Sequence, residues 1–271
     1  MHLQAYLDRI GYKGPIRPDA GVLRAVHRAH AETIPYENLD VQLETPVTRA
    51  CKAAFDKIVT RRRGGWCYEM NGLLGWALEE IGFKVERLAG AVARDERGDD
   101  AVGNHLVLIV QLDEPWLADA GFGDGLIEAI PLRMGAFSNG PFHCRLEDIG
   151  GGWMRYHNDP RGGGPTFDFN RSVSDEVLLE KACGLLQTHE ESIFVLNAVV
   201  QRWLPGQHIS MRGRVFTALS SDNKIVDLID SADAYMQALE ERFGLTLPEA
   251  TSLWPKICAR HEVVFGEPSQ P

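Results

Sequence analysis

The residues best suited to chemistry are a cysteine, a histidine and an aspartate, Cys67, His105 and Asp119, which fall within one compact part of the chain. Cys67 follows the glycine pair Gly64-Gly65 and begins a run of apolar residues at helical spacing. A thiol in the first turn of a helix feels the positive end of the helix dipole, which favours the thiolate. The sequence therefore predicts a nucleophilic Cys67 with a lowered pKa and little bulk around its sulfur.

His105 opens one apolar run and Asp119 closes the next, with a tight turn expected at 113–115. Two strands joined by so short a turn pair antiparallel, which places His105 and Asp119 side by side. A helix that presents Cys67 to this hairpin completes a nucleophile, a base and an orienting carboxylate. In that site His105 removes the thiol proton, and Asp119 holds the imidazole and stabilises its charged form.

Each of the three residues also has a plainer interpretation. Cys67 could simply fill space in the core, His105 could be a hydrogen-bonded core histidine, and Asp119 could cap the turn before Gly121. Their order, their local context and their closeness along the chain favour a joint catalytic site over coincidence.

Three motifs within residues 34–123 resemble those of the arylamine N-acetyltransferases. They are Arg63-Gly64-Gly65-Trp66-Cys67-Tyr68-Glu69 followed by Asn71, then Ile34-Pro35-Tyr36-Glu37-Asn38-Leu39 with Tyr where Phe is usual, and Asp119-Ala120-Gly121-Phe122-Gly123 with Ala in place of Val. The order of the cysteine, the histidine and the aspartate also matches the family. The C-terminal third of the chain matches it only in general layout.

The resemblance implies an α+β fold around a thiol-protease-like Cys-His-Asp core. An N-terminal helical bundle (1–86) would carry the nucleophile, a central antiparallel β-barrel (87–190) would carry the histidine and the aspartate, and an α/β lid (191–271) would complete the chain. It also implies that Cys67 takes an acetyl group from acetyl-CoA, a co-substrate rather than a permanently bound cofactor. A ping-pong reaction would then pass the acetyl group to the nitrogen of a small aromatic amine or hydrazine.

Further residues are expected around the substrates. The candidate substrate- and cofactor-binding residues are Tyr36, Tyr68, Gly121, Phe122, Gly123 and Gly125. Backbone N–H groups near Tyr68, at a helix start, are candidates for an oxyanion hole. By resemblance the loop 121–125 faces the coenzyme, and its N–H groups could meet phosphates, although a plain turn is the commoner meaning of such a loop. Tyr36 and Phe122 are expected to wall the acceptor pocket, or else to be ordinary core aromatics.

Two rival functions remain open at this stage. A cysteine hydrolase or transglutaminase-type enzyme would use the same triad with water or a protein amine as the acceptor. The papain-type histidine lies roughly 130–150 residues after the cysteine, much farther than in this chain, which weakens the protease version. A non-catalytic binding domain that has kept the fold is the second rival, and the intact triad argues against it.

The composition limits the kinds of partner and ligand that the chain is expected to bind. The chain of 271 residues has a formal net charge of −10, which argues against nucleic acid and means that an anionic coenzyme needs a local basic patch. Five cysteines without paired spacing predict reduced thiols in a cytoplasmic protein. The spacings typical of zinc ligands are absent, so no metal is expected, and no apolar run is long enough for a membrane helix. The sequence does not fix the oligomeric state, and a homodimer is compatible with it.

Apolar periodicity predicts the elements that position these residues. Helices are predicted at 3–10, 23–30, 53–59, 67–81, 174–188, 231–243 and 248–260. Strands are predicted at 85–93, 105–110, 116–119, 142–146 and 153–157, followed by a meander at 194–203, 208–219 and 225–228. A loop is predicted at 36–38, leading into an alternating segment at 39–43. We also expect a buried ion pair between Glu37 and Arg63, unless Arg63 instead binds a coenzyme phosphate.

Overall fold

The computed structural model describes residues 1–266. The helices are α1 (Leu3–Ile10), α2 (Ala20–Thr33), α3 (Leu39–Gln42), α4 (Cys51–Phe55), the π-helix η1 (Asp56–Thr60), α5 (Cys67–Ile81), α6 (Arg94–Arg97), the 3-10 helix η2 (Gly98–Ala101), α7 (Glu176–Thr188), α8 (Ile193–Leu196), α9 (Ala232–Phe243), the 3-10 helix η3 (Pro248–Leu253) and α10 (Trp254–Phe265). None of these helices is long and apolar enough to cross a membrane.

The strands form two antiparallel sheets. They are β1 (Tyr36–Glu37), β2 (Lys84–Val92), β3 (His105–Gln111), β4 (Pro115–Leu117), β5 (Ile130–Pro131), β6 (Gly135–Asn139), β7 (Phe142–Gly150), β8 (Trp153–His157), β9 (Thr166–Asn170), β10 (Val199–Leu204), β11 (Gln207–Arg212), β12 (Val215–Ser220) and β13 (Lys224–Leu228). One sheet has eight strands in the order β5-β4-β3-β2-β9-β8-β7-β6, and the other has five in the order β1-β10-β11-β12-β13.

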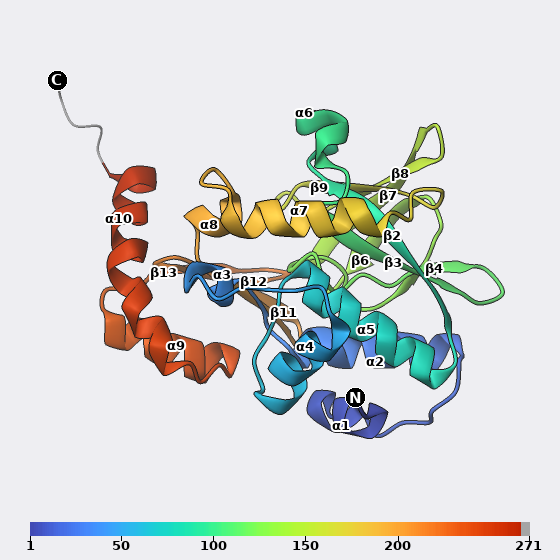
Figure 1. Ribbon diagram of the computed structural model, residues 1–271, viewed down its shortest axis with the longest axis horizontal. Helices are drawn as coiled ribbons and strands as arrows, with labels where there is room; N and C mark the ends of the chain where they lie inside the picture. The colour runs from blue at the N-terminus through green and yellow to red at the C-terminus, as the bar shows by residue number, and fades with distance from the viewer. Residues whose placement is uncertain (267–271) are drawn as a thin grey trace.

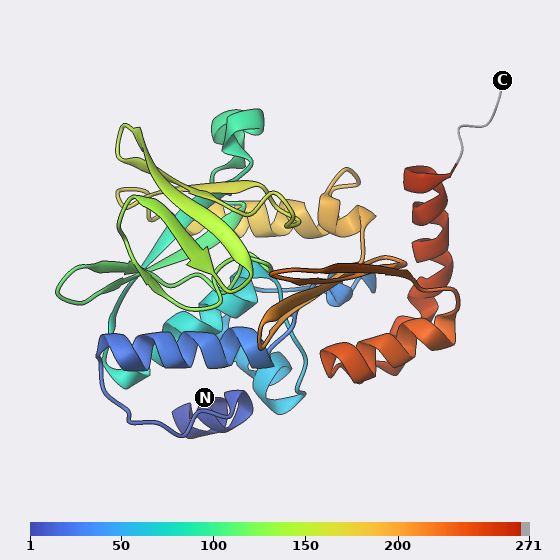
Figure 2. The ribbon, with the colours of Figure 1, turned by 180° about the vertical axis from the view of Figure 1, so that it is seen from behind.

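The predicted α+β fold is confirmed. Helices α1, α2, α4 and α5 pack beside the eight-stranded sheet, which curls into a half-barrel, and the five-stranded sheet with α3, α9 and α10 forms the other end of the molecule (Figures 1 and 2). Helix α7 runs between the two ends. The boundaries at 86/87 and 190/191 stay a prediction, and residues 267–271 of the last region lie outside the described residues.

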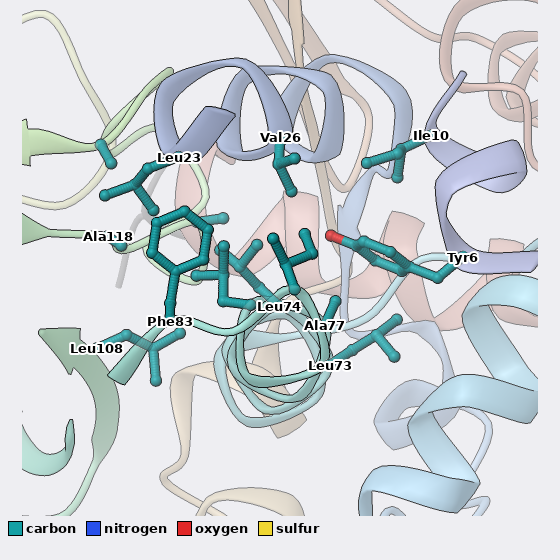
Figure 3. Packing of buried hydrophobic residues seen from close by; sticks show 14 of the residues in the cluster. Tyr6, Ile10, Leu23, Val26, Leu73, Leu74, Ala77, Phe83, Leu108 and Ala118 are labelled. Carbon is teal, nitrogen blue, oxygen red and sulfur yellow. The ribbon is translucent and has the colours of Figure 1, made fainter. Parts of the chain in front are cut away.

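Helix α5 is the centre of the N-terminal core. Its apolar residues recur every three or four positions, so Leu73, Leu74 and Ala77 lie on one stripe that is fully buried. Figure 3 shows Tyr6 of α1 and Val26 of α2 closing over that stripe. The helix ends at Gly82, whose φ of 109° is left-handed. This packing fixes the direction of α5 and therefore the place of Cys67 at its start.

Three histidines, His27, His30 and His208, are buried and lie outside the predicted triad. Tyr6 Oη and His30 Nδ1 are 2.8 Å apart, and His27 Nδ1 lies 3.3 Å from the carbonyl of Ile127. Burial lowers the pKa of His27 to about 4 and that of His30 to about 3. His27 and His30 are therefore neutral polar residues within the core.

We expect His30 to make the fold acid-sensitive. Between pH about 3 and 6.5 a neutral buried His30 binds fewer protons in the folded chain than in the unfolded one, so stability falls as the pH falls through that window. The loss approaches about 1.4 kcal/mol per pH unit for such a group. Urea unfolding of His30→Gln across pH 4 to 7, roughly that window, should show a shallower loss than wild type.

The variant is compared with wild type at each pH because two buried carboxyl groups have the opposite effect on the pH dependence of stability. Burial raises the pKa of Glu69 to about 7 and that of Asp124 to about 6, so these groups favour the folded chain at low pH. The matched control is His143→Asn, at an exposed histidine, which should keep the wild-type slope. Equal slopes for His30→Gln and wild type would contradict the prediction.

Four local predictions need correction. Residues 36–37 form strand β1 rather than a loop, because Tyr36 pairs with Gln201 of β10. The alternating segment 39–43 is helix α3, with its backbone N–H at Leu39 bonded to the Glu37 carboxylate at 2.7 Å. The remaining two lie in the meander: 194–203 begins with helix α8 before β10, and 208–219 is two strands joined by a turn at Gly213, whose φ is 56°.

Candidate active site

A buried network of charges holds the start of α5. Arg63 Nη2 lies 2.8 Å from Glu37 Oε1 and 2.9 Å from Asp40 Oδ1, so the predicted Glu37–Arg63 pair is confirmed. Lys57 Nζ lies 2.9 Å from both Asp40 Oδ2 and Glu69 Oε2. Sequence reasoning did not find Asp40 and Lys57, which lie outside the three motifs, and it quoted Glu69 within a motif without giving it a role. Because Arg63 does not line the cavity described below, its charge serves this network and not a coenzyme phosphate.

Removing one charge from this network should destabilise the fold. Arg63→Gln leaves Glu37 and Asp40 short of a buried partner, which costs roughly 3 to 5 kcal/mol in the free energy of unfolding. Arg61→Gln is the matched control, because its pair with Asp56 is exposed and contributes at most about 1 kcal/mol. Chemical denaturation of the two variants beside wild type checks this, and equal losses for both would contradict it.

The surroundings of Cys67 overturn one prediction. The thiol is 2% exposed, and burial, with the charges of Cys183 and Asp119, raises its pKa well above the usual range. The predicted lowered pKa is therefore wrong. The Glu69 carboxylate lies at the positive end of α5, where its Oε2 accepts a hydrogen bond from the N–H of Trp66 at 3.2 Å. This negative charge offsets the helix dipole that was expected to favour the thiolate. Cys67 thus keeps its proton until a base takes it.

The candidate base is His105, which is held by the carboxylate of Asp119. His105 Nε2 donates to Asp119 Oδ2 at 2.6 Å, and both side chains are buried. Burial alone would raise the pKa of Asp119, but the charge of His105 and its hydrogen bond keep it below the usual range. With Nε2 occupied by an ionised carboxylate, His105 has Nδ1 left to accept a proton.

Asn71 joins the nucleophile helix to the His–Asp hairpin. Its Nδ2 donates to Asp119 Oδ1 at 2.9 Å and to the carbonyl of Leu106 at 2.6 Å, while its Oδ1 accepts from the N–H of Ala120 at 2.9 Å. Sequence reasoning quoted Asn71 within a motif but gave it no role. Its position one helical turn after Cys67, on the same face, was the available signal.

The triad borders a cavity of about 850 Å³. Cys67 and His105 line it, and Asp119 lies behind His105. Of the other predicted residues, Tyr36, Gly121 and Phe122 line this catalytic cavity. Lining residues that sequence reasoning did not find include Phe194, Gln201 and His208, which come from the C-terminal part of the chain.

The other predicted binding residues lie beside the cavity rather than in its wall. Tyr68 Oη donates to the carbonyl of Gly103 at 2.7 Å, and Gly123 and Gly125 do not line the cavity. Gly121 must be a glycine, because a Cβ there would lie 2.7 Å from Asn71 Nδ2 and 3.0 Å from Cys67 Cα. The binding roles of all these residues stay predictions.

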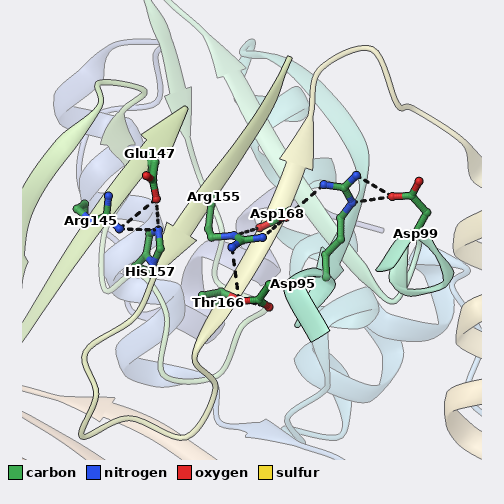
Figure 4. A network of polar contacts seen from close by, with 9 residues as sticks. Asp95, Asp99, Arg145, Glu147, Arg155, His157, Thr166 and Asp168 are labelled. Carbon is green, nitrogen blue, oxygen red and sulfur yellow. Dashed lines mark hydrogen bonds and ion pairs between the residues drawn. The ribbon is translucent and has the colours of Figure 1, made fainter. Parts of the chain in front are cut away.

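A polar network fixes one rim of the catalytic cavity. Figure 4 shows Arg155 bonded to the buried Asp168 across β8 and β9, at 2.6 and 2.9 Å. Arg94 of α6 reaches the same carboxylate at 3.5 Å and lies over the Trp153 ring at 3.9 Å. The segment that carries Arg97, a lining residue, is thereby pinned to the sheet.

The sequence of the chain matches that of known proteins over most of its length. A sequence model of the N-acetyltransferase family matches residues 19–252. The arylamine N-acetyltransferase of Mycolicibacterium smegmatis is 36% identical over 267 residues, covering 91% of this chain and 93% of that protein. The Escherichia coli K12 protein of the same name is 30% identical, covering 92% and 90%. The chain belongs to the arylamine N-acetyltransferase family.

Solved structures of arylamine N-acetyltransferases share the fold over almost the whole chain. The Mycobacterium marinum protein in complex with CoA superposes with a TM-score of 0.86 at 30% identity, covering 97% of this chain and 99% of that one. The M. smegmatis protein superposes with a TM-score of 0.85 at 36% identity, covering 96% and 98%. Membership of the arylamine N-acetyltransferase family makes the chain an acyltransferase, as the three motifs indicated.

Proposed function

We propose that this enzyme transfers the acetyl group of acetyl-CoA to the nitrogen of an aromatic amine or hydrazine through an acetylated Cys67. The observation that carries the proposal is that Cys67 and His105 border one cavity, with His105 bonded to Asp119, in a chain of this family. The M. marinum relative was solved with CoA, which supports the same co-substrate here.

In the first half-reaction His105 Nδ1 removes the proton of the Cys67 thiol, and the sulfur attacks the thioester carbon. Acid–base assistance of this kind contributes about 10² to 10⁴ in rate. The N–H groups of Leu106 and Tyr68 point at the sulfur and lower its pKa, so they favour the thiolate against burial. The thiolate of CoA leaves and takes the proton from His105.

In the second half-reaction the amine attacks the acetyl-cysteine, and His105 removes the proton that the nitrogen loses. The sulfur leaves and takes that proton from His105, which restores the Cys67 thiol and the neutral imidazole. Phe122 supports the placement of an aromatic acceptor, because its ring centroid lies 5.7 Å from that of His105 and it borders the cavity. Tyr36 borders the same cavity from β1. We assign the acceptor site to these two aromatic walls.

Incubation with acetyl-CoA and no amine tests the acetyl-enzyme. Intact-mass spectrometry should find one acetyl group per chain, and peptide mapping should place it on Cys67. Adding 4-aminobenzoate or hydrazine should discharge it and yield the acetylated amine, with parallel double-reciprocal plots. A label that leaves at the same rate with and without the amine would identify a hydrolase instead, and an unlabelled Cys67 would refute the acetyl-cysteine route.

Two finer statements belong to the same proposal. We assign the enzyme to the cytoplasm, where its five cysteines would stay reduced, and to the metabolism of foreign amines. A homodimer is the proposed assembly, and sedimentation velocity at two protein concentrations tests it. A single species of monomer mass at both would contradict the dimer.

A further inference from the structure

The charges of the network at the start of α5 do not balance. The network holds three carboxylates and two cations, namely Glu37, Asp40 and Glu69 with Lys57 and Arg63. All five residues are buried, none more than 7% exposed. No other cationic group of residues 1–266 lies within 4.0 Å of the three carboxylates. A buried negative charge without a partner is so unfavourable that such a site binds a proton instead.

Two of the three carboxylates are well stabilised as anions. Glu37 Oε1 accepts from Arg63 at 2.8 Å, and its Oε2 accepts from the N–H of Leu39 at 2.7 Å. Asp40 meets a cation at each oxygen, Arg63 at Oδ1 and Lys57 at Oδ2, both at 2.9 Å. Burial alone would raise the pKa of Asp40, but the charges of Lys57 and Arg63 hold it below the usual range.

Glu69 is the carboxyl group left to bind the proton. Lys57 and the N–H of Trp66 share its Oε2, at 2.9 and 3.2 Å, and no donor of residues 1–266 bonds to its Oε1. Burial raises the pKa of Glu69 to about 7 against the opposing charge of Lys57. The unbonded Oε1 is the atom at which a proton can be held without breaking either contact of Oε2.

The remaining titratable groups around Glu69 carry no charge that could replace this proton. Tyr36 of β1, Tyr68 of α5 and Cys183 of α7 are acids whose pKa values burial raises, that of Cys183 to about 12, so all three are neutral. The charged groups that face Glu69 are therefore those of the network itself: Lys57 of η1, Glu37 of β1, Asp40 of α3 and Arg63 just before α5.

We propose that Glu69 is a positioning residue that controls how readily Cys67 loses its proton, being protonated at mildly acid pH and ionised at mildly alkaline pH. The inference rests on the proposed function, in which the Cys67 thiolate attacks acetyl-CoA. Glu69 acts through the first turn of α5, because its Oε2 holds the N–H of Trp66, the residue directly before Cys67. When ionised, Glu69 cancels the positive end of the helix dipole. When protonated, it leaves that end to favour the thiolate.

Two substitutions that remove the same charge from the network should act in opposite directions. Glu69→Gln keeps an oxygen for the N–H of Trp66 and is neutral at every pH. Asp40→Asn balances the network equally well, but it removes a charge that favours the protonated form of Glu69, so Glu69 stays ionised to lower pH. The measurement is the rate at which iodoacetamide alkylates Cys67, taken as a ratio to wild type at each pH. Because Cys67 is buried and keeps its proton, this rate reports the thiolate fraction.

The two variants should differ from wild type at opposite ends of the pH range. Glu69→Gln should match wild type near pH 5.5 and react about tenfold faster above about pH 8, the effect of one charge acting over roughly 10 Å at an effective dielectric constant near 20. Asp40→Asn should react more slowly than wild type near pH 5.5 and match it above about pH 8. Glu80→Gln, at an exposed carboxylate near the other end of α5, is the matched control and should keep the wild-type rate throughout.

Two readouts need no cysteine chemistry. The infrared difference spectrum between wild type and Glu69→Gln at mildly acid pH should contain the C=O stretch of one protonated carboxyl group, which disappears at mildly alkaline pH. In urea unfolding, wild type should lose stability relative to Glu69→Gln as the pH rises from 4.5 to about 7, because Glu69 binds more protons in the folded chain than in the unfolded one. The same unfolding curves report whether each variant is folded.

The outcomes separate this inference from the proposed function. Ratios to wild type that do not change with pH, shifts of both variants in one direction, or no infrared band would overturn the role of Glu69, even if the enzyme acetylates amines. If Glu69→Gln does not fold, an unchanged rate for Asp40→Asn at mildly acid pH would overturn it equally. If the band and the ratios appear as expected but no amine is acetylated, the proposed function fails and the proton site at Glu69 stands.

Discussion

Cys67→Ala is expected to abolish acetyl transfer, lowering kcat at least about 10⁴-fold, because no acetyl-enzyme can form. Cys67 is the cysteine that borders the catalytic cavity, whereas the other cysteines of the described chain do not line it. Product formation is measured by chromatography of the acetylated amine. Cys67→Ser should be almost as inactive, since a serine hydroxyl is much harder to deprotonate than a thiol even with His105 as the base.

The control for this prediction is Cys51→Ala, at a half-buried thiol near the start of α4. It should keep the wild-type kcat and the wild-type unfolding midpoint. Substantial turnover by Cys67→Ser, with no acetyl group on the protein, would mean that the amine attacks acetyl-CoA directly. The two-step route would then be wrong although the fold and the family hold.

Asp119→Asn is expected to lower kcat roughly 10²- to 10⁴-fold while the chain still folds. Asp119 Oδ1 accepts from Asn71 Nδ2 and from the N–H of Gly121, at 2.9 and 2.8 Å. The new amide must keep its oxygen toward these donors, so its NH₂ group faces His105. His105 Nε2 then has to accept a hydrogen bond, which moves the ring proton to Nδ1. In that tautomer His105 cannot take the thiol proton.

Single-turnover acetylation of Cys67 by acetyl-CoA measures this effect directly. It should slow by the same factor as the overall reaction, which a merely structural role for Asp119 would not require. The matched control is Asp168→Asn, which also removes a buried carboxylate but one bonded to Arg155 and Arg94. It should lower the unfolding midpoint and keep kcat. Near wild-type acetylation by Asp119→Asn would reduce Asp119 to a turn residue.

Local periodicity was enough to predict the elements around the triad. The stripe through Leu73, Leu74 and Ala77 and the stop at Gly82 define α5, and the short turn before β4 brings Asp119 next to His105. Periodicity failed where contacts between distant parts of the chain determine the backbone conformation. The side chain of Asn38 donates to the carbonyls of Phe194 and Asn197, at 2.8 Å each, and this contact holds α3 and α8 where the sequence suggested strands.

The sequence predicted which residues form the site better than it predicted their protonation states. The residue types of the triad are visible in the sequence, but the protonation of Cys67 depends on how completely the fold buries it. The same holds for Lys57, whose charge is stable only because Asp40 and Glu69 surround it. Burial and long-range pairing are properties of the assembled core, and no short motif records them.

Strand β1 has a consequence for the order in which the enzyme assembles during synthesis. It carries Tyr36 yet belongs to the five-stranded sheet, and beside it Val199 N donates to Asn38 Oδ1 across 161 residues of chain. Contacts of such high sequence separation form late, because closing a long loop is entropically unfavourable. A nascent chain halted before β10 would already hold Cys67, His105 and Asp119 but lack one wall of the catalytic cavity. The cavity that holds the substrates is therefore completed only after the strands from β10 onward have been synthesised.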